Sequence, residues 1–161
     1  MIALAPPRNV RRGVRVAVLI AIASAVVAVP VRSAGSTQLS SARKSVWDGV
    51  YTEAQAGRGK VAYEKSCSEC HGDDMRGVED VRSPALIGQR FELVWDHTTV
   101  GDLLARVSNT MPQSAPGSLD HDEYLDIVAF LLKSNTFPAG SQELRGEFTE
   151  LQTIELTLHK K

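Results

Sequence analysis

The chain is poor in cysteine. Its 161 residues contain two, Cys67 and Cys70, and both lie in one C-x-x-C stretch. A disulfide between them would close a very small loop, which contributes little stability in the loop-entropy picture. A structural zinc site needs four ligands, usually from two separated pairs, and a thioredoxin-like redox pair needs a βαβ context that the sequence does not indicate. The two thiols are therefore predicted either to attach a group covalently or to take part in a reaction.

Basic residues are scarce beyond the N-terminus. Five of the 18 lysines and arginines lie in residues 1–33, which contain no acidic residue, and this leaves 13 basic against 19 acidic residues in the rest of the chain. Nucleic-acid binding requires a basic face, so the composition argues against that class of protein. Mild acidity is common in soluble domains and favours a basic or neutral partner only weakly.

Long hydrophobic runs are also lacking. The longest, Val16–Val29, is shorter than the roughly 20 residues that a membrane-spanning helix needs. Arginines precede it and Pro30 follows, which is the pattern of a secretory signal. We expect residues 1–33 to be a signal peptide that directs the protein to the periplasm, with an uncleaved membrane anchor as the alternative. The small, polar residues 34–44 are expected to form a flexible linker.

The remaining pattern predicts an all-α domain over residues 45–140, with three or more short helices and long loops. The first helix is expected at Thr52–Cys67. A capping-box pattern and a helical apolar period predict the second at Thr99–Thr110. The third begins at the N-cap Asp120, also in a capping box, and ends before Pro138. The helices account for the apolar periodicity of this part of the chain.

The C-terminal residues 141–161 fall outside these helices. Ile154, Leu156 and Leu158 alternate with polar residues, as in a strand, but one isolated strand has nothing to pair with. We expect this tail to pack on the domain or to be disordered.

His71 follows the second cysteine and completes C-S-E-C-H, the covalent haem attachment pattern C-x-x-C-H. Two thiols one helical turn apart reach the two vinyl groups of one porphyrin edge and become thioethers. The next residue then directs its imidazole at the iron. Covalent attachment retains haem in a domain too small to enclose it, and it is completed after export. The predicted cofactor is one haem c, bound by Cys67, Cys70 and His71.

The second axial ligand is expected to be Met111, 40 residues downstream, where the second helix ends and a loop rich in proline begins. Met75 follows His71 by four residues and should stay on the same side of the haem. His97 and His121 are rival ligands without a spacing argument. With His71 and Met111 both bound, the iron has no open site and suits electron transfer. Without Met111 it would be a five-coordinate sensor or minor peroxidase.

At this point the sequence resembles the class I c-type cytochromes with one haem, over about Ser45–Pro138. The matching features are C-S-E-C-H, the distal loop N-T-M-P, and Gly59 with Tyr63 on a first helix that crosses the last helix around Tyr124–Leu132. The resemblance implies the small cytochrome c fold, one haem with His71 and Met111 as axial ligands, and periplasmic electron transfer by a carrier, not an enzyme.

A looser resemblance points to partners. Three stretches, S-V-W-D-G-V-Y-T-E-A-Q-A-x-R-G, T-T-V-G-D-L and M-P-x-x-x-P-G-S-L, are similar to cytochrome subunits or fused domains that accompany bacterial quinoprotein dehydrogenases. This implies electrons taken from such a dehydrogenase and passed to a terminal oxidase or another cytochrome. The acidic residues Asp73, Asp74, Glu79 and Asp80 are a candidate docking patch.

Overall fold

A computed structural model of the protein describes residues 43–79 and 83–160. These residues belong to one compact unit, which runs from Ser40 to Lys161. The signal peptide expected at residues 1–33 and nearly all of the expected linker lie outside the described residues. Within the part that is described, the search for a helix long and apolar enough to cross a membrane finds none.

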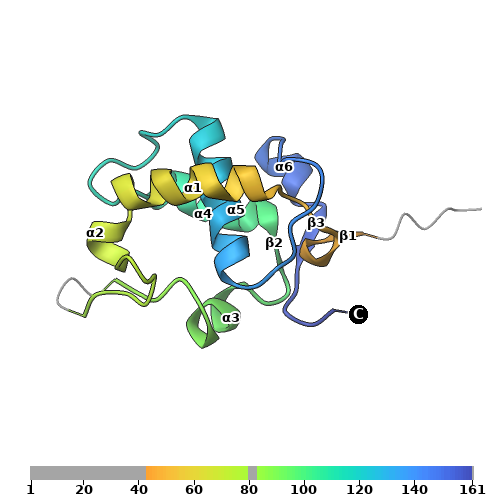
Figure 1. Ribbon diagram of the computed structural model, residues 1–161, viewed down its shortest axis with the longest axis horizontal. Coiled ribbons are helices and arrows are strands. Elements are labelled where there is room, and N and C mark those ends of the chain that lie inside the picture. Colours follow the sequence, from red (N-terminus) through yellow and green to blue (C-terminus); the bar gives the residue numbers. More distant parts are fainter. Residues whose placement is uncertain (1–42, 80–82, 161) are drawn as a thin grey trace, which may run out of the picture. The chain divides into compact units, whose positions relative to one another are not determined.

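The described residues form six α-helices, one 3-10 helix and three very short strands (Figure 1). Along the chain these are β1 (Lys44–Ser45), η1 (Val46–Asp48), α1 (Glu53–Ser66), α2 (Ser68–His71), α3 (Gln89–Trp95), β2 (Thr98–Thr99), α4 (Val100–Thr110), α5 (His121–Ser134), α6 (Phe148–Leu151) and β3 (Ile154–Leu156). The predicted helical fold with long loops is confirmed, and a small sheet is added to it.

The three predicted helices begin where their capping residues lie. The Thr52 hydroxyl accepts a hydrogen bond from the Gln55 amide at 3.1 Å, at the start of α1. Thr99 and Asp102 form a reciprocal capping box at the start of α4, and α5 begins with a capping box after Asp120. The short helix α3 was not predicted, because its seven residues are too few to show a helical period.

Helices α1 and α5 cross at close range near the middle of the domain (Figure 1). Gly59 permits the approach, because a Cβ atom there would lie 1.8 Å from the carbonyl oxygen of Asp126. One turn further along α1, the ring of Tyr63 packs against Phe130, with 5.5 Å between ring centroids. The predicted crossing of Gly59 and Tyr63 with the last long helix is confirmed.

The C-terminal tail supplies the central strand of the sheet. β3 pairs in parallel with β1, where Lys44 opposes Ile154, and antiparallel with β2, where Thr98 opposes Leu156. The prediction that this strand has nothing to pair with is wrong, because its partners are two-residue strands without a recognisable period. Leu156 is fully buried, and the tail joins the hydrophobic core through this residue and its apolar neighbours.

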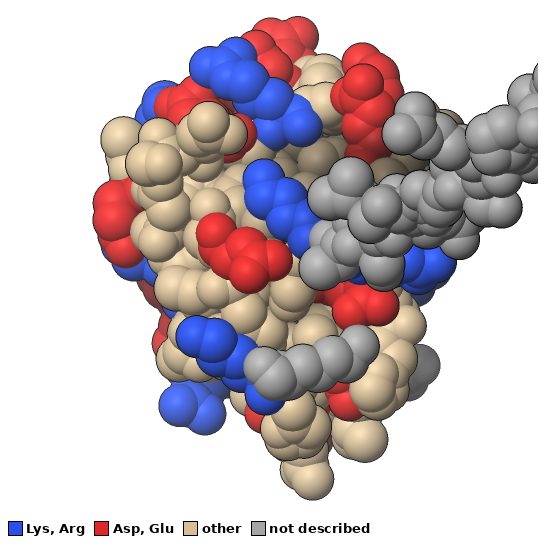
Figure 2. All heavy atoms as spheres, turned by 90° about the vertical axis from the view of Figure 1, so that its right-hand side faces the viewer, with Lys and Arg blue, Asp and Glu red and all other residues tan. Residues whose placement is uncertain are grey.

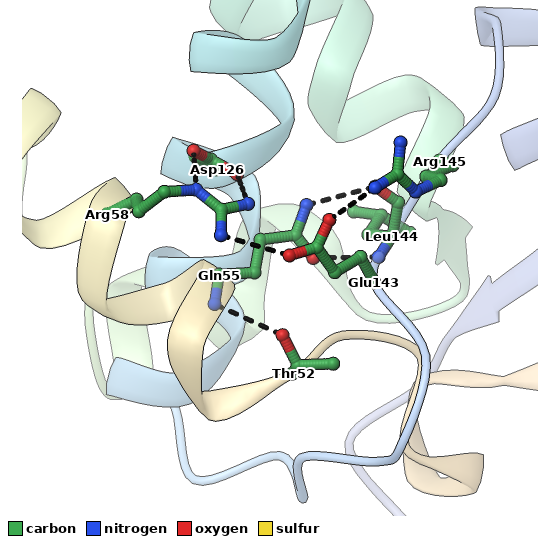
Figure 3. A network of polar contacts seen from close by, with 7 residues as sticks. All are labelled: Thr52, Gln55, Arg58, Asp126, Glu143, Leu144 and Arg145. Atoms are coloured by element: carbon green, nitrogen blue, oxygen red, sulfur yellow. Dashed lines mark hydrogen bonds and ion pairs between the residues drawn. The ribbon is translucent and has the colours of Figure 1, made fainter.

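A buried amide ties the tail to α1 (Figure 3). Gln55 is 2% exposed, and its side chain donates to the carbonyl of Leu144 at 2.9 Å while accepting from the Leu144 amide at 2.7 Å. The side-chain amide therefore bonds a backbone segment as a neighbouring strand would. Both polar groups are satisfied away from water, which avoids the cost of burying them unpaired.

An ion-pair network lies beside this amide and joins three parts of the chain (Figure 3). Arg58 on α1 forms a bidentate pair with Asp126 on α5, at 2.8 and 2.9 Å, and a further bond of 2.9 Å with Glu143 in the tail. Arg145 also bonds Glu143, at 2.7 Å. Hydrogen bonding from Arg58 holds the pKa of Glu143 below its usual range, and Arg145 contributes to the same effect.

We predict opposite effects for two glycine substitutions in α1. Gly59→Ala should destabilise the protein by about 2–3 kcal/mol, because its methyl group collides with the α5 backbone. Gly57→Ala is the matched control, since a Cβ there meets nothing within 4 Å and alanine favours helix by up to about 1 kcal/mol. Thermal unfolding of both variants measures this, and shifts of the same sign would contradict the described crossing.

The network also predicts a pH dependence. Because the pKa of Glu143 is lower in the folded state, its ionised carboxylate stabilises the fold at pH values above the ordinary pKa of 4.5. This contribution to stability is lost as the pH falls through the lowered pKa. Glu143→Gln should therefore lower the Tm at pH 7, and the difference from the wild type should shrink at pH 3. Glu64→Gln, which removes a local ion pair with Lys60, is the control and should change the Tm little.

Candidate cofactor site

The two cysteines lie where α1 passes into the single turn of α2. Cys67 caps the end of α1, and its amide donates to the carbonyl of Tyr63 at 2.8 Å. The Cys67 carbonyl then accepts from the amides of Cys70 and His71, at 3.2 and 3.0 Å. One helical turn thus separates the two sulfur-bearing residues, which is the spacing that the sequence predicted.

The environment of the thiols argues against disulfide chemistry. Cys67 and Cys70 are partly buried and are not bonded to each other. Burial, and then the neighbouring Cys70, raise the pKa of the Cys67 thiol to about 11. Exchange reactions need a thiolate, and reactive cysteines have a lowered pKa. The described residues also contain no cluster of three or more His, Cys, Asp or Glu side chains that could hold a metal ion.

His71 is buried and its ring is fixed by one hydrogen bond. The side chain is 6% exposed, and Nδ1 lies 3.0 Å from the carbonyl oxygen of Pro84. A carbonyl only accepts, so Nδ1 carries the proton, and the lone pair of Nε2 is left as the donor atom for a metal. This tautomer suits an imidazole ligand to iron, and the donor set fits the predicted group.

The backbone around His71 is held by α1 and by its own turn. The Tyr63 hydroxyl donates to the carbonyl of Gly72 at 2.7 Å, directly after the histidine. The carbonyl of His71 accepts from the amide of Gly77 at 2.9 Å. Gly77 has φ +83° and a Cβ there would meet the Ser83 carbonyl at 2.4 Å, so the turn requires glycine. The histidine is therefore anchored on both sides.

Asn135, at the end of α5, anchors the segment that contains Pro84. Its side-chain amide donates to the carbonyl of Leu86 at 3.0 Å, and its Oδ1 accepts from the amide of Gly88 at 3.1 Å. The same amide donates to Leu131 within α5. Sequence analysis identified neither Pro84 nor Asn135 as a residue of the site. Their bonds to His71 and Leu86 join residues 13 and 49 positions apart, and such separations leave no short-range sequence pattern.

Met111 lies where the sequence predicted, at the C-cap of α4. Its amide donates to the carbonyl of Val107 at 2.9 Å and its backbone is extended, so the chain leaves the helix there. Its carbonyl accepts a 2.8 Å bond from the hydroxyl of Tyr124 on α5. The side chain is partly buried. Met111 thus stands at the boundary between the core and an exposed loop.

The rival ligands are engaged elsewhere. Met75 is 3% exposed and packs in the hydrophobic core. The side chain of His97 is 81% exposed and lies 3.4 Å from Asp96, and the exposed His121 lies 3.1 Å from the carbonyl of Gly146. The choice of Met111 as the second ligand stays a prediction.

Apolar side chains on α4 and α5 are buried. Val100 and Leu104 on α4, and Ile127 and Leu131 on α5, are each at most 4% exposed, while Leu86 is partly buried. The helix that ends at Met111 and the last long helix thus supply a dry wall of low polarity.

The chain was compared with known protein families. Residues 54–131 match the family described as "Cytochrome C oxidase, cbb3-type, subunit III". The match begins in α1, includes C-S-E-C-H and Met111, and ends within α5. Among curated proteins and among solved structures, no significant match to this chain is found.

We predict that Asn135→Ala loosens the segment after Pro84. Loss of its bonds to Leu86 and Gly88 should lower the free energy of unfolding by about 1–2 kcal/mol and speed hydrogen exchange at the Gly88 amide. Lys133→Ala, near the same end of α5, removes an exposed ion pair with Glu53 of α1 and is the control. Unchanged exchange at Gly88 in Asn135→Ala would show that Asn135 does not hold this segment.

Proposed function

We propose that the protein transfers single electrons between partner proteins in the periplasm through covalently bound haem c, because residues 54–131 match a family of c-type cytochromes. When bound, haem c supplies an iron that alternates between Fe(III) and Fe(II). The observation that carries the proposal is the buried His71, whose Nδ1–H bond to Pro84 leaves Nε2 as a ligand atom.

Four residues would hold the group. Cys67 and Cys70 would attach it through thioethers, and His71 and Met111 would bind its iron. Methionine as the second ligand raises the reduction potential relative to a second histidine. With two ligands supplied by the protein, no position on the iron would be left for a substrate, which favours a carrier over a sensor or peroxidase.

The chain's own residues then keep the site rigid and dry. The bonds of Tyr63 to Gly72 and of Asn135 to Leu86 fix the backbone on either side of the histidine and its acceptor. A ligand that does not move between the two oxidation states reduces the reorganisation that accompanies electron transfer. The anchoring of His71 therefore serves the proposed function directly.

The redox partners of the protein are also proposed. The looser sequence resemblance favours a quinoprotein dehydrogenase as the electron donor. The name of the matching family, a subunit of a cytochrome c oxidase, favours a terminal oxidase or another cytochrome as the acceptor. In the candidate acidic patch, Asp74 lies 3.6 Å from Arg76, so the patch is not of one sign. On the face shown in Figure 2, charges of both signs are likewise interspersed. Such mixed surfaces suit transient encounters with small, wet interfaces.

We predict that Met111→Ala abolishes the near-infrared sulfur-to-iron charge-transfer band of the oxidised protein and lets the reduced protein bind carbon monoxide rapidly. Met75→Leu is the matched control, because it removes the other sulfur of the described methionines with little change in volume and should leave the band intact. Absorption spectra of the two variants measure both effects.

Two results would contradict the proposal. If the wild type lacks the charge-transfer band, methionine does not bind the iron. If its reduced form binds carbon monoxide as fast as Met111→Ala does, the site is open, and the sensor or peroxidase function replaces electron transfer.

A further inference from the structure

Each of the three tyrosines donates its hydroxyl to a backbone carbonyl. The pairs are Tyr51 with Phe137 at 2.6 Å, Tyr63 with Gly72 at 2.7 Å and Tyr124 with Met111 at 2.8 Å. All three side chains are buried, with at most 3% exposed. Because the rings and bonds are so alike, differences in their roles depend on which carbonyl each hydroxyl holds.

The hydroxyl of Tyr124 makes a second contact. Besides donating to the carbonyl of Met111, it accepts the amide of Leu119 at 3.5 Å, the long limit for such a bond. One phenol oxygen can donate and accept at once. It therefore touches both ends of the Met111–Leu119 segment and closes that segment onto α5.

The segment between these two ends is exposed. Residues 113–118 face solvent, whereas Met111, Pro112 and Leu119 are partly buried. Two local turns bond its backbone, from Ala115 to Pro112 at 2.9 Å and from Ser118 to Ala115 at 3.3 Å. Hydrogen bonds between residues three apart shape the segment but do not attach it to a helix. The attachment to α5 that involves Met111 itself is the Tyr124 hydroxyl.

We propose that Tyr124 is a positioning residue, whose hydroxyl fixes the backbone of Met111 and thereby keeps the methionine sulfur on the iron. The inference rests on the proposed His71–Met111 ligation and adds a residue to it. Packing of the Tyr124 ring against Leu119 stabilises the start of α5 with or without the hydroxyl. The positioning role belongs to the oxygen alone.

Tyr124→Phe separates these two roles, because it keeps the ring and removes the oxygen. Tyr51→Phe is the matched control, since it removes an equally buried hydroxyl from the carbonyl of Phe137, which lies outside the segments of the proposed ligands. The probe is imidazole, titrated into the oxidised holoprotein and followed by loss of the charge-transfer band. Imidazole binds where methionine has left, so its apparent affinity reports the fraction of protein with methionine released.

The expected result is imidazole binding about tenfold tighter in Tyr124→Phe than in the wild type, because one hydrogen bond to Met111 is lost and its carbonyl is left unpaired. Tyr51→Phe should bind imidazole as the wild type does, although both variants lower the Tm by a similar amount. Hydrogen exchange at the Leu119 amide should rise in Tyr124→Phe alone.

Equal imidazole affinities in the two variants, with the charge-transfer band present in the wild type, would overturn the role of Tyr124 and leave the proposed function standing. Absence of the band in the wild type would overturn the methionine ligation and, with it, the inference about Tyr124. The two failures are therefore distinguishable from the same set of spectra.

Discussion

The close approach of α1 to α5 at Gly59 is the constraint on which the rest of the structure depends. No side chain larger than hydrogen fits between Gly59 and the Asp126 carbonyl, so the two helices are fixed at one distance. Tyr63 on α1 then reaches the backbone after His71, and Tyr124 on α5 reaches the backbone of Met111. The spacing of two helices thus becomes the spacing of the two segments proposed to hold the iron.

Much of this arrangement could be predicted from local sequence. The starts of α1, α4 and α5 follow from capping residues within four positions, and C-S-E-C-H is legible without any structure. The site's supporting bonds could not be predicted in this way. The acceptor of His71 lies 13 residues away, and Asn135 bonds Leu86 across 49 residues, so neither leaves a periodic signal.

The sheet could not be predicted from local sequence either. β1 and β2 have two residues each, and a strand of that length has no alternation to detect. Both pair with β3, where Ser45 and Thr99 oppose Glu155. The last of the stretches similar to quinoprotein-associated subunits, from Met111 to Leu119, is the segment that Tyr124 closes.

The position of β3 between β1 and β2 has a consequence for the order of folding. Lys44 pairs with Ile154, and the Trp47 indole donates to the Thr157 carbonyl across 110 residues at 2.8 Å. Contacts at such separation carry a high loop-closure entropy and form slowly. The helices beside the cysteines are local and can form earlier. The sheet therefore closes only after almost the entire chain has been synthesised, whereas the turn that carries Cys67, Cys70 and His71 can form earlier.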